Sequence, residues 1–276
     1  MNDTGIIWTN ETWNPMSGCV KVSAGCKFCY AEAIAEAKRG TAAFPVGFDL
    51  MLRPHKLREP YRLKAPSLIF VNSMSDLFLE QIPDSYRDQV FDVIADTPQH
   101  EYQILTKRPG EMLRYSLRRP FPQNVWAGVS VENQSAAETR IPTLLQVEAS
   151  IRFLSIEPLL GPVGLSSWIA AGLHWVIVGG ESGTQVTSKP AGRERALVSL
   201  EAGRWVPKPE AVEWVRLLRD QCVAAEVRYF HKQWGGPRPH SGGRLLDGRT
   251  WDEMPRLPEG GAENRRLLGR LTTAVC

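Results

Sequence analysis

The sequence predicts an α/β protein whose parallel sheet closes, fully or partly, into a (β/α) barrel of the TIM type. Short apolar runs alternate with helical patterns along most of the chain, as expected of a parallel sheet with crossover helices. With 276 residues and 43% hydrophobic content, the chain can bury one large core. A doubly wound open sheet is the alternative. The Gly-x-Gly-x-x-Gly motif that commonly marks that fold does not follow the first expected strand.

About seven strand-and-helix units are expected in order. A first strand within residues 6–18 leads into a loop rich in cysteine, and a helix over 30–39 follows, with Gly40 as its C-terminal cap. The later strands are short apolar runs, each followed by a polar turn. They are expected at 68–71, 101–105, 125–129, 151–154, 174–178 and 227–230.

We expect the barrel to occupy residues 1–234, with loop insertions at 40–66 and 183–208. The first insertion contains several prolines and no clean period, and the second is long for a loop in a compact domain. Residues 235–276 are rich in Gly, Pro and Arg, which predicts a C-terminal extension that packs on the barrel and ends in a mobile tail.

Charge and hydropathy limit the partners only weakly. The formal net charge of +3 is too small to indicate a nucleic-acid partner by itself. No apolar run approaches the ~18 residues of a membrane span, and the first residues are polar without a basic leader. We therefore expect a cytoplasmic protein with no membrane partner.

Polar residues fall at the ends of successive expected strands. In an α/β barrel the working face lies at the carboxyl ends of the strands, so these side chains should converge around one mouth. A single acid after a strand is often only a cap for the next helix, but the repeated placement favours a site. The predicted catalytic residues are Lys107, Glu132, Glu157, Glu181 and Lys232, with Asp76 beside them.

Three of the five cysteines, Cys19, Cys26 and Cys29, lie within eleven residues and are predicted to bind metal. Cys29 stands at a helix entrance, where backbone N–H groups favour thiolate. Three thiolates leave one metal position open, which fits a 4Fe-4S cluster with one free iron. A zinc site and an inert group of thiols are the alternatives. Cys222 falls on the apolar face of an expected helix and is interpreted as a core thiol.

The segment Cys26-Lys27-Phe28-Cys29 resembles the second half of the radical S-adenosylmethionine signature, although six residues separate the first two cysteines here, where that superfamily usually has three. A closer resemblance spans nearly the whole chain. It is to a phage-associated and bacterial family of three-cysteine, radical-SAM-like proteins of undetermined function. The segments that carry it are 8–9, 12–15, 18–30, 72–78, 105–109, 128–132, 155–158, 179–182, 232–235 and 246–249.

This resemblance implies a radical-SAM type of barrel, a 4Fe-4S cluster and S-adenosylmethionine as cosubstrate. Gly179-Gly180-Glu181 resembles the Gly-Gly-Glu that holds the methionine amino group in that superfamily, but there the motif follows the second strand. In this chain that place is held by residues 72–76, so the amino-group contact is assigned to Ser73, Ser75 or Asp76. The remaining residues predicted to bind the cofactor are Ser130, Gly179 and Gly180.

Two functional classes remain. The first is an enzyme that cleaves S-adenosylmethionine reductively, with a reductant such as flavodoxin or ferredoxin and an unknown substrate for which a nucleic acid or nucleotide is one candidate. The second is a non-catalytic zinc or iron-sulfur protein that binds nucleic acid through the basic residues of 51–64 and 189–208. The polar residues at the strand ends favour the enzyme, because a non-catalytic nucleic-acid-binding protein would not explain why they recur at this position.

Overall fold

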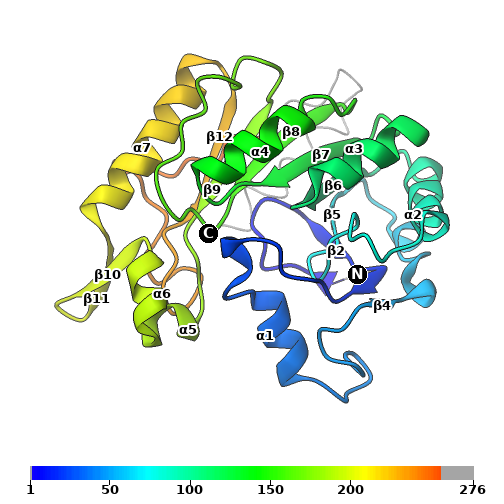
Figure 1. Ribbon diagram of the computed structural model, residues 1–276, viewed down its shortest axis with the longest axis horizontal. Coiled ribbons are helices and arrows are strands. Elements are labelled where there is room, and N and C mark those ends of the chain that lie inside the picture. The colour runs from blue at the N-terminus through cyan, green and yellow to red at the C-terminus, as the bar shows by residue number, and fades with distance from the viewer. Residues whose placement is uncertain (1, 256–276) are drawn as a thin grey trace.

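The computed structural model describes residues 2–255, which form a parallel half-barrel (Figure 1). Its main sheet has the order β1-β2-β5-β6-β7-β8-β9-β12, in which β2 to β12 run parallel and β1 pairs antiparallel with β2. The strands are β1 (Asn2–Asp3), β2 (Glu11–Trp13), β5 (Leu68–Val71), β6 (Glu101–Thr106), β7 (Val125–Ser130), β8 (Ile151–Ile156), β9 (Trp175–Gly179) and β12 (Arg228–Gln233). The predicted α/β parallel barrel is confirmed in its partial form.

The crossover helices cover one face of this sheet, and several of the smaller elements lie near its carboxyl ends (Figure 1). The covering helices are α2 (Asp84–Asp96), α3 (Pro109–Arg118), α4 (Gln134–Leu144) and α7 (Pro209–Ala224). The smaller elements are α1 (Tyr30–Ala37), α5 (Thr184–Ser188), α6 (Pro190–Arg195), the paired strands β3 (Met16–Ser17) and β4 (Met51–Leu52), the hairpin of β10 (Val198–Glu201) and β11 (Arg204–Pro207), and the short 3-10 turns Ala24–Cys26, Pro54–Lys56 and Pro60–Arg62.

Local sequence fixes where the covering helices begin. Pro109 and Pro209 stand at the first position of α3 and α7, where the missing N–H costs no hydrogen bond. Asn133 caps α4, and its side-chain oxygen accepts a hydrogen bond of 2.9 Å from the Ala136 amide. These helix starts determine where the turns from the preceding residues into these helices end.

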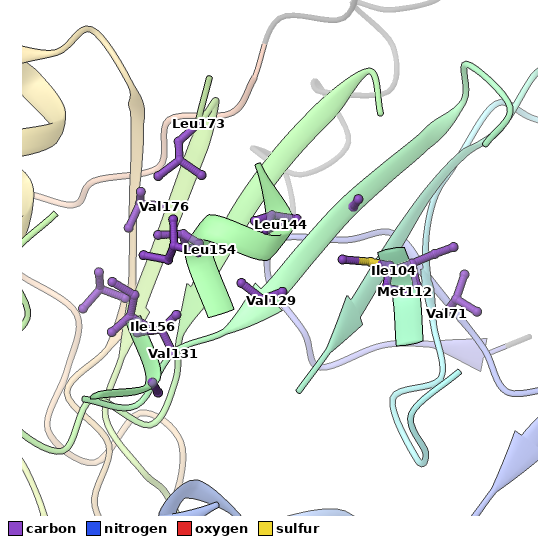
Figure 2. Packing of buried hydrophobic residues seen from close by; sticks show 14 of the residues in the cluster. Val71, Ile104, Met112, Val129, Val131, Leu144, Leu154, Ile156, Leu173 and Val176 are labelled. Atoms are coloured by element: carbon purple, nitrogen blue, oxygen red, sulfur yellow. The ribbon is translucent and has the colours of Figure 1, made fainter. Parts of the chain in front are cut away.

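Alternation along the strands divides the core into two layers. Val71, Ile104, Val129, Leu154 and Val176 point toward the helices and pack against them (Figure 2). The residues between them point to the opposite, concave face, because successive side chains of a strand alternate. One sheet therefore supports a helix-facing core and a separate interior layer.

Aromatic rings fill the interior layer. Trp175 of β9 contacts Trp126 of β7, Phe153 of β8 and Phe230 of β12, with ring centroids 5.7 to 6.0 Å apart. Trp8, from the segment before β2, closes over Trp175 at 6.1 Å. Because β7 and β9 are not neighbours in the sheet, their contact shows that the sheet curves around this layer.

The predicted insertion at 183–208 contains more regular structure than the loop that was expected. It holds α5, α6 and the β10–β11 hairpin. The hairpin turns at Ala202 and Gly203, which have φ of 46° and 80°. Ala is an unusual residue for a turn of this kind, so this stretch carries no strong sequence signal for a hairpin.

The C-terminal extension packs on the barrel edge as far as the structure describes it. The His231 amide donates to the Trp251 carbonyl at 2.9 Å, and the Glu253 amide donates to the Tyr229 carbonyl at 3.1 Å. Residues 251–253 thus pair antiparallel with the outer edge of β12. The predicted mobile tail, with Cys276, falls in residues 256–276 and lies outside the described part of the chain.

Within residues 2–255, no helix combines the length and the apolar character that a membrane crossing requires.

Replacing Trp251 should weaken the attachment of this edge. The Trp251 side chain is 9% exposed, lies against Tyr229 with centroids 5.8 Å apart and donates to the Leu246 carbonyl. We expect Trp251→Ala to lower the free energy of unfolding by about 3 kcal/mol in urea denaturation, because a large side chain leaves a cavity. Leu245→Ala, at a residue that is 57% exposed, should change it by less than about 0.5 kcal/mol. Equal losses would contradict an anchoring role.

His231 should make stability depend on pH. Burial lowers the pKa of its imidazole to about 3, and the positive charge of Arg244 acts in the same direction. Below pH ~6.5 the unfolded chain binds a proton at His231 that the folded chain does not bind. The free energy of unfolding therefore falls as the pH falls from ~6.5 toward 3.

His231→Leu should remove this loss, which amounts to at most about 1.4 kcal/mol per pH unit, in urea denaturation at a series of pH values. The exposed His55→Leu serves as the control. If the free energy of unfolding changed with pH in the same way for His231→Leu and the unchanged protein, His231 would be protonated in the folded state.

Candidate functional site

A cavity of about 550 Å³ opens at the carboxyl ends of the parallel strands. Its lining joins the cysteine loop, the turns after β5, β6, β8 and β9, the end of β12 and the segment before β2. Most of the predicted site residues lie in this lining. They are Cys19, Cys26, Cys29, Ser73, Ser75, Asp76, Lys107, Ser130, Glu157, Gly180, Glu181 and Lys232.

Two predicted residues, Glu132 and Gly179, are not part of the lining. Glu132 is buried behind the cysteine loop, with 1% of its surface exposed. Gly179 stands against Glu157, since a Cβ on Gly179 would lie 2.4 Å from the Glu157 Oε1 atom. Gly180 lines the cavity, but a Cβ there would lie 2.1 Å from the Trp234 carbonyl oxygen, so protein backbone fills that side.

The two-residue period of the strands explains the polar mouth. Phe153, Ser155 and Glu157 follow one another on the concave side of β8 and its turn, so the interior changes from aromatic to acidic within five residues. On β12 the interior changes in the same way from the aromatic Phe230 to the basic Lys232. Each strand therefore supplies an apolar floor and a polar rim.

The cysteine loop begins at Gly18, a residue that its surroundings require to be glycine. Gly18 has φ of +87°, and a Cβ would lie 2.3 Å from the Asp49 carbonyl oxygen. Its amide donates to the Met74 carbonyl at 3.0 Å, and its own carbonyl accepts from the Ser75 hydroxyl at 2.6 Å. The turn after β5 thus fixes the direction in which the chain enters Cys19.

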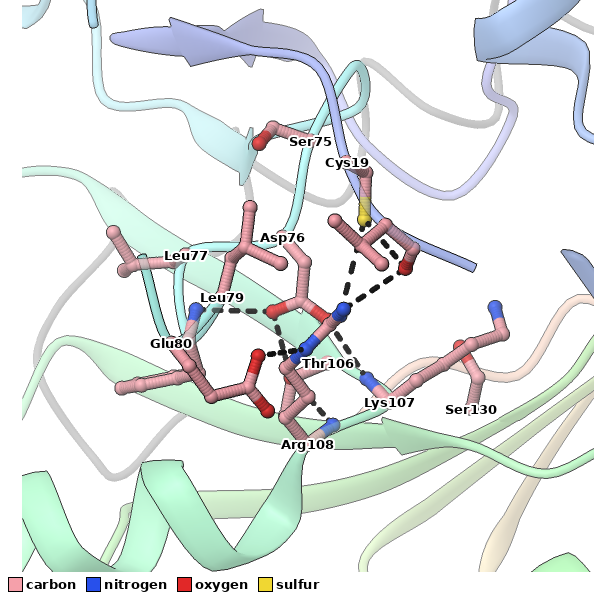
Figure 3. Close-up of polar contacts among 12 residues, drawn as sticks. Cys19, Ser75, Asp76, Leu77, Leu79, Glu80, Thr106, Lys107, Arg108 and Ser130 are labelled. Atoms are coloured by element: carbon pink, nitrogen blue, oxygen red, sulfur yellow. Dashed lines mark hydrogen bonds and ion pairs between the residues drawn. The ribbon is translucent and has the colours of Figure 1, made fainter. Parts of the chain in front are cut away.

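Arg108 holds the first end of the cysteine loop (Figure 3). Its buried guanidinium forms ion pairs with Asp76 at 3.1 Å and Glu80 at 2.9 Å. The same group donates to the Val20 carbonyl at 2.8 Å and to the Cys19 Sγ atom at 3.8 Å. The loop is therefore tied to the strand turns by a charged group whose donors are distributed among four partners.

Asp76 has no acceptor position to spare. Its Oδ1 atom accepts from the Phe78 amide and the Thr106 hydroxyl, and its Oδ2 atom accepts from the Lys107 amide and Arg108. This carboxylate orients the turn after β6 and the arginine that it carries. Figure 3 shows Asp76, which belongs to the turn after β5, beside Lys107 and Arg108 of the turn after β6.

Glu132 holds the far end of the cysteine loop. Its Oε1 atom accepts from the Ser23 hydroxyl at 2.6 Å and lies 3.8 Å from Lys107 Nζ. Its Oε2 atom accepts from Arg140 at 3.0 Å. Ser23 lies three residues before Cys26, so Glu132 acts on the position of the loop that carries this thiol.

The thiols of Cys19 and Cys26, near the two ends of the loop, differ in acidity. Burial raises the pKa of Cys19 to about 11; Asp76 adds to this effect and Arg108 opposes it. Burial also disfavours the Cys26 thiolate, but hydrogen bonds from the Val22 backbone, together with the charge of Lys107, outweigh it and lower the Cys26 pKa. Cys29 directly precedes α1, as the sequence predicted for the third cysteine.

The acidic side chains of the rim are paired with cations. Lys232 Nζ lies 3.1 Å from Glu157 Oε1, and Arg195 Nε lies 2.9 Å from Glu181 Oε2. Burial raises the pKa of Glu181, which the charge of Arg195 opposes. Arg195 also stacks over Phe28 of the cysteine loop at 5.3 Å, so α6 is joined to the loop through this arginine.

Other lining groups had weak sequence signals. Asn72 stands before the predicted serines, and its side-chain amide makes no hydrogen bond within residues 2–255. Tyr30 donates to the Ser73 carbonyl at 2.6 Å, and Trp8 forms part of the floor. His240 reaches the rim from the C-terminal extension, a placement that only the folded chain reveals.

The three loop cysteines are free thiols on one cavity wall. Among residues 2–255, no three His, Cys, Asp or Glu side chains converge in a way that could hold a single metal ion. Each cysteine of a multi-iron cluster binds a different iron, so a cluster does not require the thiols to meet at one point.

Several basic residues of the predicted nucleic-acid segments have partners within the chain. Arg53 is buried, where it donates to Ser17 and to the Ala43 carbonyl. Lys208 donates to the carbonyls of Arg193 and Glu194, at the end of α6. These residues therefore contribute to the insertions themselves.

Fold and site together define a three-cysteine half-barrel protein with a cavity at the carboxyl ends of its strands. The chain belongs to the family described as Protein of unknown function (DUF5131), which matches residues 3–255. The comparison with curated proteins gave no match.

Two solved structures of spore photoproduct lyase are similar to this chain. A Cys-to-Ser mutant has a TM-score of 0.50 at 9% sequence identity, over 80% of this chain and 75% of that chain. A Tyr-to-Phe mutant has a TM-score of 0.49 at 9% identity, over 78% of this chain and 74% of that chain. At this identity the first likeness concerns the fold alone, which is a parallel α/β half-barrel.

Removing Arg108 should be costly for the fold. The change leaves Asp76 buried without its cation, and breaking a buried pair typically costs about 3 to 5 kcal/mol. We expect Arg108→Ala to lose stability in that range in urea denaturation. Arg114→Ala removes an exposed arginine that pairs with Asp84 and should cost less than about 1 kcal/mol. A loss for Arg108→Ala no larger than the control would contradict the described network.

Proposed function

We propose that this protein is an iron-sulfur enzyme that binds a 4Fe-4S cluster through Cys19, Cys26 and Cys29 and cleaves S-adenosylmethionine reductively. One observation carries the proposal: three free thiols of a single loop line the same cavity, at the carboxyl ends of a radical-SAM-like half-barrel. When bound, such a cluster supplies one electron to S-adenosylmethionine, which yields methionine and a radical that abstracts hydrogen from a substrate.

The side chains around the thiols fit a loop that must hold its shape. Arg108 holds the loop at Cys19 and Val20, while Glu132 holds it at Ser23. Both anchoring side chains are buried, so surrounding residues hold them in place. In this proposal Glu132 is a positioning residue, although its place after β7 predicted a direct role.

The turn after β5 offers the contacts for the cosubstrate. Ser73 and Ser75 keep acceptor capacity on their hydroxyls and line the cavity, so we assign the methionine amino group to them. Asp76 supports this turn, because its oxygens already accept four hydrogen bonds. Ser130 and Gly180 line the same cavity, and Gly179 stands behind this lining, where its lack of a side chain leaves room for Glu157.

The charged rim serves the substrate. Lys107 lines the cavity and lies 3.8 Å from Glu132, an ion pair loose enough to leave the ammonium available to a carboxylate or phosphate. Glu157 with Lys232, and Glu181 with Arg195, are closer pairs that orient polar groups of the substrate without adding net charge. A nucleotide or nucleic acid is the substrate class that we favour.

The electron would come from a small redox protein such as flavodoxin or ferredoxin, since the described chain has no second group of closely spaced cysteines. We place the reaction in the cytoplasm, where free thiols stay reduced.

Metal analysis after anaerobic reconstitution tests the metal assignment. We expect about four iron per chain and no zinc. Ala substitutions of Cys19, Cys26 or Cys29 should each abolish the cluster absorbance. Cys222→Ala is the matched control, because this thiol is buried in the core; it should keep its iron and lose about 1 kcal/mol of stability. Tight stoichiometric zinc, or loss of iron in Cys222→Ala with the fold intact, would contradict the proposal.

Product analysis tests the chemistry. With a strong reductant and no added substrate, the iron-loaded protein should slowly convert S-adenosylmethionine to 5′-deoxyadenosine and methionine, because this step needs only the cosubstrate and one electron. Chromatography of the products measures it, and the Cys26→Ala protein is the blank. If the protein carried its full complement of iron and formed no 5′-deoxyadenosine, the proposed activity would be wrong.

A further inference from the structure

Asn72, directly after β5, carries an amide that the fold does not use. The residue is 3% exposed, and neither Nδ2 nor Oδ1 makes a hydrogen bond within residues 2–255. The neighbouring serines differ, because Ser73 bonds to Asn14 and Ser75 donates to the Gly18 carbonyl. Burying an unpaired amide destabilises a protein. We therefore look for the hydrogen-bond partner of the Asn72 amide outside residues 2–255.

The backbone at Asn72 gives a second reason to look for a role in binding. Its φ is +63°, a left-handed conformation that glycine adopts at the lowest cost. Glycine at this position would remove both the backbone strain and the unpaired amide. Folding alone therefore does not account for asparagine here.

Apolar side chains line the same cavity as this amide, and two of them are aromatic. Phe70 stands two residues earlier on the same side of β5, and Trp8 contacts the Phe70 ring with centroids 4.8 Å apart. Leu105 of the neighbouring strand lines the cavity as well. An aromatic ligand could pack against this surface while its edge meets the amide.

A second amide in the lining has one unused oxygen. Gln233 donates through Nε2 to the Gly180 carbonyl at 3.2 Å and to the Ser182 hydroxyl at 2.6 Å, which fixes its orientation. Its Oε1 atom has no partner among residues 2–255, and the residue is 5% exposed. A ligand that only accepts hydrogen bonds, such as a bare phosphate, would leave this oxygen and Asn72 Oδ1 unpaired.

We propose that Asn72 is the recognition group of a nucleobase subsite, for a base with an exocyclic amino group beside a ring nitrogen, as in adenine and cytosine. The side chain of asparagine offers a donor next to an acceptor, which matches such an edge. The inference rests on the proposed function for its place beside the reacting centre. The base belongs either to the adenosine of S-adenosylmethionine or to a nucleotide substrate.

Asn72→Gly tests the subsite in the iron-loaded, full-length protein. Isothermal titration calorimetry with S-adenosylmethionine, AMP, CMP and ribose 5-phosphate should show that base-containing ligands bind about tenfold more weakly, or worse, to the variant. Ribose 5-phosphate, which lacks a base, should show no difference. The melting temperature of Asn72→Gly should stay the same or rise, because strain and an unpaired amide are removed.

Glu226→Gly is the matched control. Glu226 is exposed, has φ of +56° and lies outside the cavity lining, so glycine relieves the same backbone strain there. Its ligand affinities should equal those of the unchanged protein. Unchanged base affinity in Asn72→Gly would overturn the proposal, as would a lower melting temperature with equal losses for every ligand, or no binding of any base-containing ligand to the unchanged protein.

Competition identifies the source of the base. If AMP and CMP compete with S-adenosylmethionine for the binding that depends on Asn72, or if only S-adenosylmethionine shows that dependence, the subsite holds the cosubstrate's adenine. If they bind alongside saturating S-adenosylmethionine and still depend on Asn72, it holds a substrate base. Base binding that persists in a protein unable to form 5′-deoxyadenosine would reject the proposed function and keep the subsite.

Discussion

The buried guanidinium of Arg108 connects most parts of the candidate site. Its ion pair with Asp76 joins the turns after β5 and β6, and its donors to Val20 and Cys19 bring the cysteine loop against both turns. A planar group with five donors suits this task better than lysine, whose ammonium cannot divide its hydrogen bonds in fixed directions. The cost of removing Arg108 from water is offset because its charge is balanced by two acids. The geometry of the thiols therefore depends on a charge network next to them.

The fold could be predicted to a large extent, since it follows from periodicity. Strands such as 68–71 and 175–179 are apolar on both faces, as strands covered on both sides must be. Once they are placed in a parallel sheet, their polar followers must meet at one edge. That reasoning led to Glu157, Glu181 and Lys232, all of which line the cavity. The partial closure of the barrel could not be predicted, because it depends on how far the sheet curves around rings such as Trp175.

The site was less predictable where side chains contact one another across the sequence. Glu132 follows its strand as the other acids do, yet Ser23 and Arg140 bind it behind the loop. No local pattern shows that Arg140, from the next helix, points back toward its own strand turn. Asn72 is a similar case, since a single asparagine in a turn ordinarily bonds to its own backbone. Sequence position identified the mouth of the barrel, and tertiary contacts decided which groups face into it.

Both edges of the described sheet are covered by residues near the ends of the described chain. At one edge β1 pairs with β2, and at the other residues 251–253 pair with β12. An uncovered strand edge readily pairs with another chain. During synthesis from the amino end, β12 leaves the ribosome before its covering segment does. The outer edge of β12 in the nascent chain is therefore open to pairing with neighbouring copies until residues 251–253 emerge and cover it.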